Sequence, residues 1–460
     1  MQNSVTFLEP HFESLIAHLF SSGDNEQAVF LLARQVVTEK SINLLVRKVI
    51  LIQDADIISA SRVHMSIRSR AYLSVMKQAD LNGDSLIFVH SHPDGLAEFS
   101  AQDDSEEPAL FKTAFIRIHH DIVHASLVFT DKDTFCGRVW SSDGTYSKVW
   151  SVRIIGNRFQ YLYSEPISDI PLEYFDRQAR AFTSDLQPIL KRFHVGVVGV
   201  GGTGSAVCEQ LIRLGVGKLT IVDGGAFEKS NVNRVYGSTV FDEKIPKVNI
   251  TARLAAAIGL GTEVKHIQGH LSFRSVTRQL LDCDIVFGCT DDEWGRSILN
   301  RLALRHYIPV FDMGVNIDTN KNKILSIQGR VTTLLPGAAC LFCRKRISPD
   351  RVRAESIAAS NPEEAARLRK EGYLVNIDEP APSVISFTTG IAAMAVSEFL
   401  HRLTGFQGID RKSTEVIFFF DQSRIRTNST APSTDCLCAD ETKWGTGDTR
   451  RFLDLNWRSE

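Results

Sequence analysis

Residues 194–223 read HVGVVGVGGTGSAVCEQLIRLGVGKLTIVD, and this stretch predicts the fold of a large part of the chain. An apolar run, a glycine cluster, a helical pattern and a second apolar run follow one another, as in a βαβ unit. Glycine is needed where the backbone turns tightly and where a phosphate approaches main-chain N–H groups at a helix N-terminus. The cluster contains Gly199, Gly201, Gly202 and Gly204. Asp223 ends the second apolar run, where a carboxylate can accept hydrogen bonds from ribose hydroxyls.

Taken alone, this is a dinucleotide fingerprint, and its default interpretation is an NAD-dependent oxidoreductase. Charged residues further along the chain argue against that interpretation. FEKSNVNRV contains Asn231 and Arg234, IPKVN contains Lys247, and GCTDDEWGR places Asp291 after a predicted strand. A nicotinamide enzyme has no need for two cations and an additional acid near its phosphates. An enzyme that expels pyrophosphate from ATP does, because Arg and Lys neutralise charge and an Asp holds Mg²⁺.

Strand and helical patterns continue to alternate after this stretch, in LTIVD, DIVFGCTD and IPVFDMGV with helical segments between them. The alternation predicts an α/β fold with a doubly wound, Rossmann-like parallel sheet. Residues 351–372, RVRAESIAASNPEEAARLRKEG, are polar and helix-prone, and we expect an exposed crossover there.

The first 150 residues have their own pattern of amphipathic helix and buried strands, in FESLIAHLFSS, QAVFLLARQVV, SLIFVHSHP and ASLVF. The pattern weakens before two prolines, Pro166 and Pro171. A chain of 460 residues suits two or three domains. We therefore expect an N-terminal domain at 1–150, a linker at 151–170, a second domain at 171–440 and a loosely ordered tail at 441–460.

One N-terminal strand ends in a candidate metal site. His90 and His92 occupy alternate positions of an extended segment, so their rings point to one side, and Pro93 stiffens the exit. Asp103 could supply a third ligand from the next turn, with Asp104 as a weaker alternative. Three protein ligands leave one tetrahedral position free, which a catalytic Zn²⁺ needs to hold a water. Such a site also needs a general base within hydrogen-bond reach of that water.

These residues resemble the JAB/MPN (JAMM) metalloproteases, whose signature combines H-x-H-P, S-x-x-D and an upstream glutamate. The resemblance covers about the first 140 residues. It implies the zinc ligands His90, His92 and Asp103, with Ser100 bonding the developing oxyanion and Glu26 as the general base. Asp24 lies close to Glu26 and competes for the role of base. A domain that docks the substrate without cleaving it is an open alternative.

The region from Phe175 to Asp440 resembles the ThiF/MoeB and ubiquitin-activating (E1-like) superfamily. Its motifs correspond to Arg177-Gln178, Gly199 to Gly204, Asp223, Ser230 to Arg234, Pro246-Lys247 and Cys289 to Asp291. The resemblance implies that Lys247, Asn231 and Arg234 contact phosphates and that Asp291 binds Mg²⁺. It also implies a homodimer, in which Arg177, with Arg234 as a further candidate, reaches into the other subunit's site.

The same resemblance implies the substrate, which is the C-terminal glycine carboxylate of a small ubiquitin-like (β-grasp) protein. Adenylation gives the carboxylate a good leaving group before a thiol, hydroxyl or sulfide attacks it. A conjugating-enzyme-like protein is the expected acceptor, and the JAB domain would trim the precursor or release it from conjugates. Activation of a sulfur carrier for cofactor or cysteine synthesis is the alternative. The resemblance also suggests a role in bacterial antiphage defence, because defence systems contain similar pairings of activator and peptidase.

Four cysteines in the last third of the chain predict a structural zinc site. They form a C-x-x-C pair and a C-x-C pair, and four thiolates make a closed tetrahedral site. The ligands would be Cys340, Cys343, Cys436 and Cys438. The family usually has two C-x-x-C pairs, so one ligand could differ here. Four buried or free thiols are the alternative, and the other four cysteines are expected to pack in core elements.

Residues 344–390 contain no cysteine, although members of the superfamily that this region resembles usually carry a reactive cysteine in the crossover when they pass the activated protein onward. Two routes follow for the activated carboxylate. The acyl-adenylate could pass directly to a partner's nucleophile, or a hydroxyl such as Ser383 could accept the acyl group as an ester. A serine before a helix is also commonly an N-cap.

The charge balance excludes strong attraction to polyanions. There are 52 basic and 54 acidic side chains, so we expect neither a nucleic-acid nor a membrane partner. The least polar run, Thr388 to Leu400, is too short to span a bilayer and contains Glu398. The N-terminal residues lack the basic-then-apolar layout of a signal peptide, so we expect a cytoplasmic protein.

Overall fold

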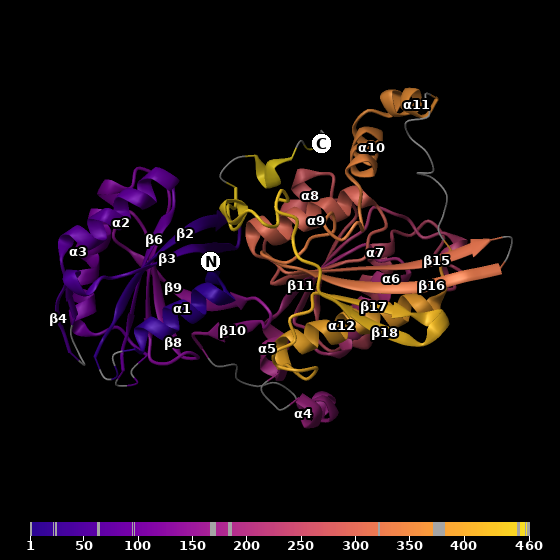
Figure 1. Cartoon of the computed structure of the whole chain (residues 1–460). Coiled ribbons are helices and arrows are strands. Elements are labelled where there is room, and N and C mark those ends of the chain that lie inside the picture. The colour runs from indigo at the N-terminus through magenta and orange to yellow at the C-terminus, as the bar shows by residue number, and fades with distance from the viewer. Residues whose placement is uncertain are drawn as a thin grey trace. The chain divides into compact units, whose positions relative to one another are not determined.

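The computed structural model describes all residues except 1, 22, 24, 62–64, 94, 96, 166–171, 183–185, 321–322, 371–381, 449–450, 456 and 458–460. The chain divides into two compact units (Figure 1). Unit 1 comprises Met1–Ser168 and Gly445–Asp448, and unit 2 comprises Asp169–Trp444 and Thr449–Glu460.

Unit 1 is built on a mixed sheet in the order β1-β3-β2-β6-β7-β8-β9-β10, and β1 also pairs with β9 so that the sheet closes on itself. Its strands are β1 (Gln2–Leu8), β2 (Ala28–Val37), β3 (Ser41–Leu51), β6 (Ser85–Ser91), β7 (His124–Phe129), β8 (Phe135–Trp140), β9 (Tyr146–Ile155) and β10 (Gln160–Tyr163). A small separate sheet pairs β4 (Ile57–Ala60) with β5 (Met65–Ile67). The helices are α1 (Glu9–Leu19), α2 (Ser69–Asn82) and α3 (Ala101–Arg117).

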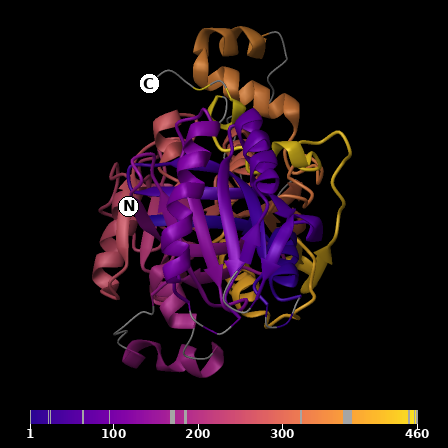
Figure 2. The ribbon, with the colours of Figure 1, turned by 90° about the vertical axis from the view of Figure 1, so that its left-hand side faces the viewer.

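The first six residues of β2, 28–33, are all apolar rather than alternating with polar residues, and the burial of both faces of the strand explains this pattern. Val29, Leu31 and Ala33 pack into a core with α1, whereas Phe30 and Leu32 point to the opposite face. Side chains of α2 and α3 pack on that second face. Figure 2 views unit 1 from the side on which these helices lie. Because successive strand residues point to opposite faces, a strand buried on both sides needs apolar residues at every position.

Unit 2 contains a second sheet in the order β13-β12-β11-β14-β15-β16-β17-β18. Its strands are β11 (His194–Val198), β12 (Lys218–Val222), β13 (Glu263–Ile267), β14 (Ile285–Gly288), β15 (Val310–Asn320), β16 (Lys323–Leu334), β17 (Glu415–Phe419) and β18 (Arg424–Asn428). Its helices are α4 (Asp176–Phe182), α5 (Leu186–Arg192), α6 (Gly202–Arg213), α7 (Lys247–Ile258), α8 (Arg274–Arg278), α9 (Glu293–His306), α10 (Pro349–Ser360), α11 (Pro362–Lys370) and α12 (Ile385–Thr404).

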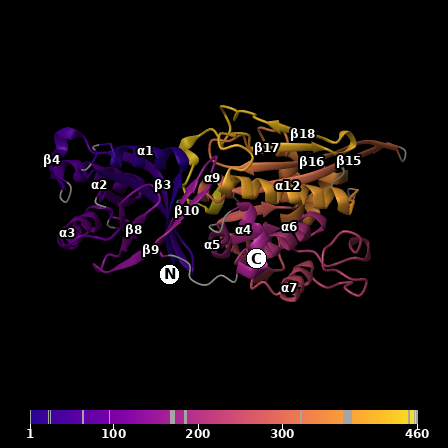
Figure 3. The same ribbon diagram turned by 90° about the horizontal axis from the view of Figure 1, so that it is seen from below.

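The Rossmann-like α/β fold is confirmed, with one addition. The strands from β13 to β15 are parallel, as the alternation of strands and helices predicts. From β15 to β18 the strands pair antiparallel, so the sheet is mixed (Figure 3). Antiparallel neighbours can follow one another through short turns, and they leave no βαβ pattern in the sequence.

The last described residues differ from the loosely ordered tail that the sequence predicts. Phe452 and Leu453 are buried in unit 2, and Arg301 of α9 donates to the carbonyl oxygen of Leu453 at 3.2 Å. The residues that the structure describes include no helix long and apolar enough to cross a bilayer.

Candidate nucleotide and metal sites

The glycine loop of unit 2 connects β11 to α6 and is held by main-chain packing. Gly199 has a φ of +83°, and a Cβ there would lie 2.8 Å from the carbonyl oxygen of Cys289. A Cβ on Gly204 would lie 1.8 Å from the carbonyl oxygen of Gly199. The carboxylate of Asp223 accepts hydrogen bonds from the backbone N–H groups of Val200 at 2.8 Å and Gly225 at 2.7 Å. Asp223 therefore ties the end of β12 to the loop.

A cavity of about 650 Å³ opens beside this loop. Most of the residues that the sequence predicts for nucleotide binding line it. They are Gly199, Gly201, Gly202, Asp223, Arg234, Lys247 and Asp291. Two cations and an acid from three separate segments thus face one space together with the glycine loop.

Three predicted residues do not line this cavity. Gly204 is buried in the first turn of α6. Asn231 is buried too, and its side-chain oxygen accepts from the backbone N–H of Glu228 at 3.2 Å, so it shapes the turn that carries Arg234. Arg177 is exposed on α4 and is not among the lining residues of this chain.

Sequence reasoning missed a buried ionic group that includes Arg296, which lines the cavity. Asp312 of β15 is fully buried between Arg330 of β16, at 2.5 Å, and Arg296 of α9, at 3.4 Å. Arg296 also donates to the carbonyl oxygen of Thr290 at 3.1 Å, which braces the segment before Asp291. The motif GCTDDEWGR ends on Arg296 and could have drawn attention to it, but no local pattern connects it to β16.

Helix α10, from the expected crossover, reaches the same cavity through Glu355. This carboxylate accepts from the backbone N–H of Trp294 at 2.8 Å, at the start of α9. Burial raises the pKa of Glu355. Ser383 also lines the cavity. It is not an N-cap, because the cap residue of α12 is Val384.

In unit 1, the predicted metal ligands lie together. His90 Nε2 is 3.1 Å from His92 Nε2 and 3.2 Å from an Asp103 carboxylate oxygen, and His92 Nε2 is 3.5 Å from the other oxygen. A tetrahedral zinc with bonds of about 2.0–2.2 Å would hold its ligand atoms roughly 3.3–3.6 Å apart. The donor set and its spacing therefore fit zinc. Phe88 stacks on the His90 ring, with centroids 5.3 Å apart, and helps to orient it.

The other predicted catalytic residues surround this group. Ser100 caps α3, and both its N–H and its hydroxyl donate to Asp103 at 2.7 Å. Burial raises the pKa of Asp103, but hydrogen bonds with the rings of His90 and His92 outweigh burial and hold that pKa well below its usual range. Glu26 is buried, and its carboxylate lies 3.9 Å from His92 Nε2.

The competing residues are placed differently. Asp104 points to Arg138, with a distance of 2.5 Å between Oδ1 and Nη2, rather than to the histidines. Asp24 lies outside the described residues.

A cavity of about 410 Å³ is lined by Glu26, His90, Ser100 and Asp103, and also by Glu107. Burial raises the pKa of Glu107 to about 7.

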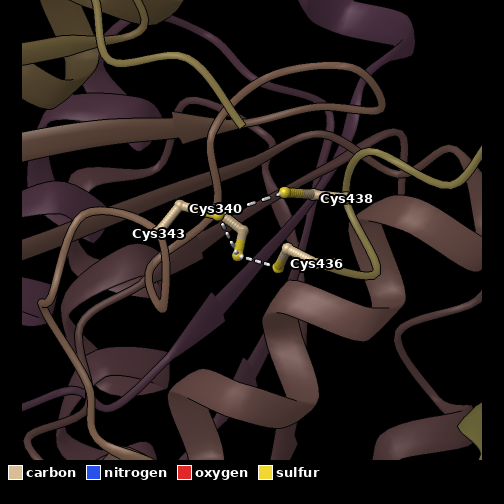
Figure 4. A group of neighbouring side chains, drawn as sticks. All are labelled: Cys340, Cys343, Cys436 and Cys438. Carbon is tan, nitrogen blue, oxygen red and sulfur yellow. Dashed lines mark hydrogen bonds between the residues drawn. The ribbon is translucent and has the colours of Figure 1, made fainter. Parts of the chain in front are cut away.

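The four C-terminal cysteines of unit 2 converge on one point (Figure 4). Cys340 Sγ lies 3.8 Å from that of Cys343 and 3.5 Å from that of Cys436, and Cys343 Sγ lies 3.6 Å from that of Cys438. Four sulfurs on a tetrahedral zinc, with bonds of about 2.3 Å, stand about 3.8 Å apart. Hydrogen bonding between the thiols of Cys340 and Cys438 lowers the pKa of Cys340 and raises that of Cys438. This donor set fits zinc.

Of the remaining cysteines, Cys208 and Cys283 lie in the core of unit 2, as expected. Cys136 of β8 and Cys289 are half-buried, and Cys289 lines the cavity beside the glycine loop. Cys208 and Cys283 are fully buried, and burial raises the pKa of both thiols, as it does for Cys289. Burial also raises the pKa of Cys136, to about 12. The thiols of Cys208 and Cys283 pack as small apolar side chains.

Comparison with known proteins shows which families and proteins the two units are similar to. The ThiF family matches residues 175–439, and the prokaryotic homologues of the JAB domain match residues 8–132. Ubiquitin-like modifier-activating enzyme 5 of Drosophila willistoni is 25% identical over 259 residues, covering 53% of this chain and 58% of that protein. The SAMP-activating enzyme E1 of Haloferax volcanii is 27% identical over 149 residues, covering 32% of this chain and 52% of that protein.

The match thus spans between half and two thirds of each of these two relatives. Among solved structures, E. coli MccB with MccA-N7isoAsn matches with a TM-score of 0.47 and 16% identity, over 59% of this chain and 77% of that one. The ThiF match covers more than half of the present chain, so the protein belongs to the ThiF family and carries an N-terminal JAB domain.

Proposed function

We propose that unit 2 uses ATP to adenylate the C-terminal carboxylate of a ubiquitin-like protein. The observation that carries this proposal is the convergence of Arg234, Lys247 and Asp291 on one cavity beside a glycine loop. Membership of the ThiF family and similarity to enzymes named for activating ubiquitin-like modifiers support it. A redox coenzyme would not require this combination of charges.

The glycine loop and the charged residues predicted from the sequence each have a chemical task in this proposal. Main-chain N–H groups of the glycine loop bind phosphate oxygens, and Asp223 accepts from the ribose hydroxyls. Lys247 and Arg234 offset the charge of the phosphates. Asp291 would hold Mg²⁺, which neutralises charge that develops on the pyrophosphate. The proposal includes a homodimer, in which Arg177 of a second subunit completes the site.

The test is ATP–pyrophosphate exchange in the presence of a β-grasp protein that ends in Gly-Gly. Asp291→Ala should reduce exchange at least a hundredfold without changing the melting temperature. Asp133→Ala, which removes an exposed carboxylate from unit 1, is the matched control and should exchange at the wild-type rate. Full exchange in Asp291→Ala would exclude the assigned role. Protein that retains NADH and ignores ATP would overturn the proposal as a whole.

We propose further that unit 1 is a zinc peptidase that trims the precursor of the same ubiquitin-like protein or releases it from conjugates. His90, His92 and Asp103 would hold the zinc, which lowers the pKa of a bound water and polarises the scissile carbonyl. Glu26 takes the proton of the attacking water, and Ser100 donates to the oxyanion. Two activities in one chain raise the concentration of a shared substrate near both sites.

Cleavage of a precursor with residues added after its terminal glycine tests this second proposal. Glu26→Gln should keep the N-terminal zinc and lose cleavage, whereas His92→Ala should lose both. Glu39→Gln, an exposed carboxylate on the same unit, should cleave normally. Unchanged cleavage in His92→Ala would show that the site is silent and would favour a docking module.

The acceptor of the activated carboxylate is also part of the proposal. Residues 344–390 contain no cysteine, so we propose that the acyl-adenylate passes directly to a conjugating-enzyme-like partner in the cytoplasm. Ser383 lines the cavity and is the alternative acceptor. An ester on the chain that withstands thiols, yields to hydroxylamine and disappears in Ser383→Ala would favour the alternative.

A further inference from the structure

Arg138 of β8 lies beside the turn that carries two residues of the candidate zinc site. Its guanidinium carbon is 3.8 Å from the centroid of the Phe99 ring and 4.6 Å from that of Tyr146. Its Nη2 is 2.5 Å from Asp104 Oδ1. A cation over an aromatic face and a charged hydrogen bond are both attractive, and they act here on two points of the same segment.

Those two points flank the residues on which zinc binding depends. Phe99 immediately precedes Ser100, and Asp104 immediately follows Asp103. Between them, Ser100 and Asp103 form a reciprocal capping box at the start of α3. A contact on each side of this box restricts both the direction of α3 and the position of the Asp103 carboxylate.

Arg138 is itself held in place by a buried hydrogen-bond network. Its Nη1 lies 3.3 Å from Oε2 of Glu107, which is 2% exposed. The same oxygen accepts from the hydroxyl of Ser126 at 2.9 Å, and this hydroxyl accepts from the indole N–H of Trp140 at 3.2 Å. The guanidinium therefore connects strands β7 and β8 to the first turns of α3.

We infer that Arg138 is a positioning residue that presents Asp103 to zinc by holding the Phe99–Asp104 turn. The inference rests on the proposed zinc site of unit 1. Lysine could not replace it fully, because a single ammonium group lacks the planar fork that bonds two carboxylates while stacking on a ring. Groups behind the metal ligands typically change metal affinity 10- to 100-fold when they are removed.

The test measures zinc affinity of the full chain by competition with a chelator, without any measurement of activity. The zinc bound by the His92→Ala variant is the zinc held elsewhere in the chain. The difference between the zinc bound by wild type and by this variant therefore reports the unit 1 site. We expect Arg138→Met to weaken this site about 10- to 100-fold and Arg138→Lys to weaken it less. Phe99→Leu, which removes only the ring, should also weaken it.

Two further variants separate positioning from general loss of stability. Arg34→Met removes a buried guanidinium that bonds Asp84 at 2.8 Å in the same unit, and it should lower stability while leaving zinc affinity unchanged. Arg138→Met combined with Glu107→Gln avoids leaving a charge unpaired, and it should still bind zinc weakly. Wild-type zinc affinity in Arg138→Met and in its combination with Glu107→Gln would overturn the inference. If wild type and His92→Ala hold the same zinc, the proposed metal site fails instead.

Discussion

Gly204 lies so close to Gly199 that a Cβ on residue 204 would stand 1.8 Å from the carbonyl oxygen of Gly199. Backbone cannot move aside as a side chain can, so Gly204→Ala should displace the loop from α6. We expect a loss of about 1–3 kcal/mol in unfolding free energy, as in overpacked cores, together with loss of ATP binding. Thermal unfolding and ATP–pyrophosphate exchange measure the two effects.

Gly201 supplies the matched control. No atom lies within 4 Å of a Cβ built there, and its φ of −72° suits any residue. Gly201→Ala should therefore fold with wild-type stability and raise the KM for ATP only if phosphate approaches the main chain at that point. Equal stability of the two variants would contradict the steric argument.

The position of His270 leads to a second prediction about the candidate nucleotide cavity. Its ring lies over Gly224, where a Cβ would be 2.2 Å from Nε2, and it lines the cavity next to Asp223. His270→Ala should raise the KM for ATP roughly fivefold, equivalent to about 1 kcal/mol for one hydrogen bond. Gly224→Ala should act by displacing the same ring. The two changes should then be non-additive in steady-state kinetics, and additive effects would count against this contact.

Removal of one of the four clustered cysteines tests the prediction of a structural zinc site. Cys438→Ser should release one zinc per chain and lower the melting temperature of unit 2 by roughly 10 °C, because metal that binds only the folded state stabilises it. Zinc content and calorimetry measure both effects. Cys208→Ala, at a buried thiol in α6, should keep the full zinc content. Equal zinc content in the two variants would refute the tetrathiolate site.

The raised pKa of Glu107 predicts that the stability of unit 1 depends on pH. Burial raises its pKa to about 7 from its ordinary value of 4.5, so between these values the folded state holds a proton that the unfolded state has lost. The unfolding free energy should therefore fall as the pH rises from about 4.5 to 7, by about 3 kcal/mol, and stay level above. Calorimetry of zinc-free protein from pH 5 to 8 measures the slope.

Glu107→Gln should remove that slope, because the amide is neutral in both states. It should match the wild type near pH 4.5 and exceed its stability above pH 7. Glu106→Gln, an exposed neighbour on α3, should keep the wild-type slope. Parallel curves for wild type and Glu107→Gln would assign the slope to another group.

Local patterns predicted the elements that position both sites. The apolar runs became strands β2, β6, β11 and β12, since their residues bury side chains on both faces. The spacing of His90, His92 and Asp103 anticipated three donor atoms within 3.5 Å of one another. Both arrangements depend on residues close in the chain, or on a strand end followed by a helix start.

Contacts between segments that are distant in the chain left no recognisable pattern in the sequence. Asp312 and its two arginines come from β15, β16 and α9, and Arg138 meets the Phe99–Asp104 turn from a different strand. The antiparallel strands after β15 and the buried Phe452 and Leu453 were also unexpected. An ion pair or a buried tail depends on which surfaces face each other after the sheet has formed, and hydrophobic periodicity does not encode that.

The amino-acid sequence by itself determined the identity of the two domains and the donor atoms available to each, because glycine turns, ligand spacing and apolar runs act over short stretches of backbone. Only the tertiary structure decided which carboxylate faces the histidines. Asp103 and Asp104 are adjacent in the chain, and Asp104 is engaged by Arg138 from across the fold. Successive helix positions project about 100° apart, so one carboxylate turns to the histidines while its neighbour turns to a cation.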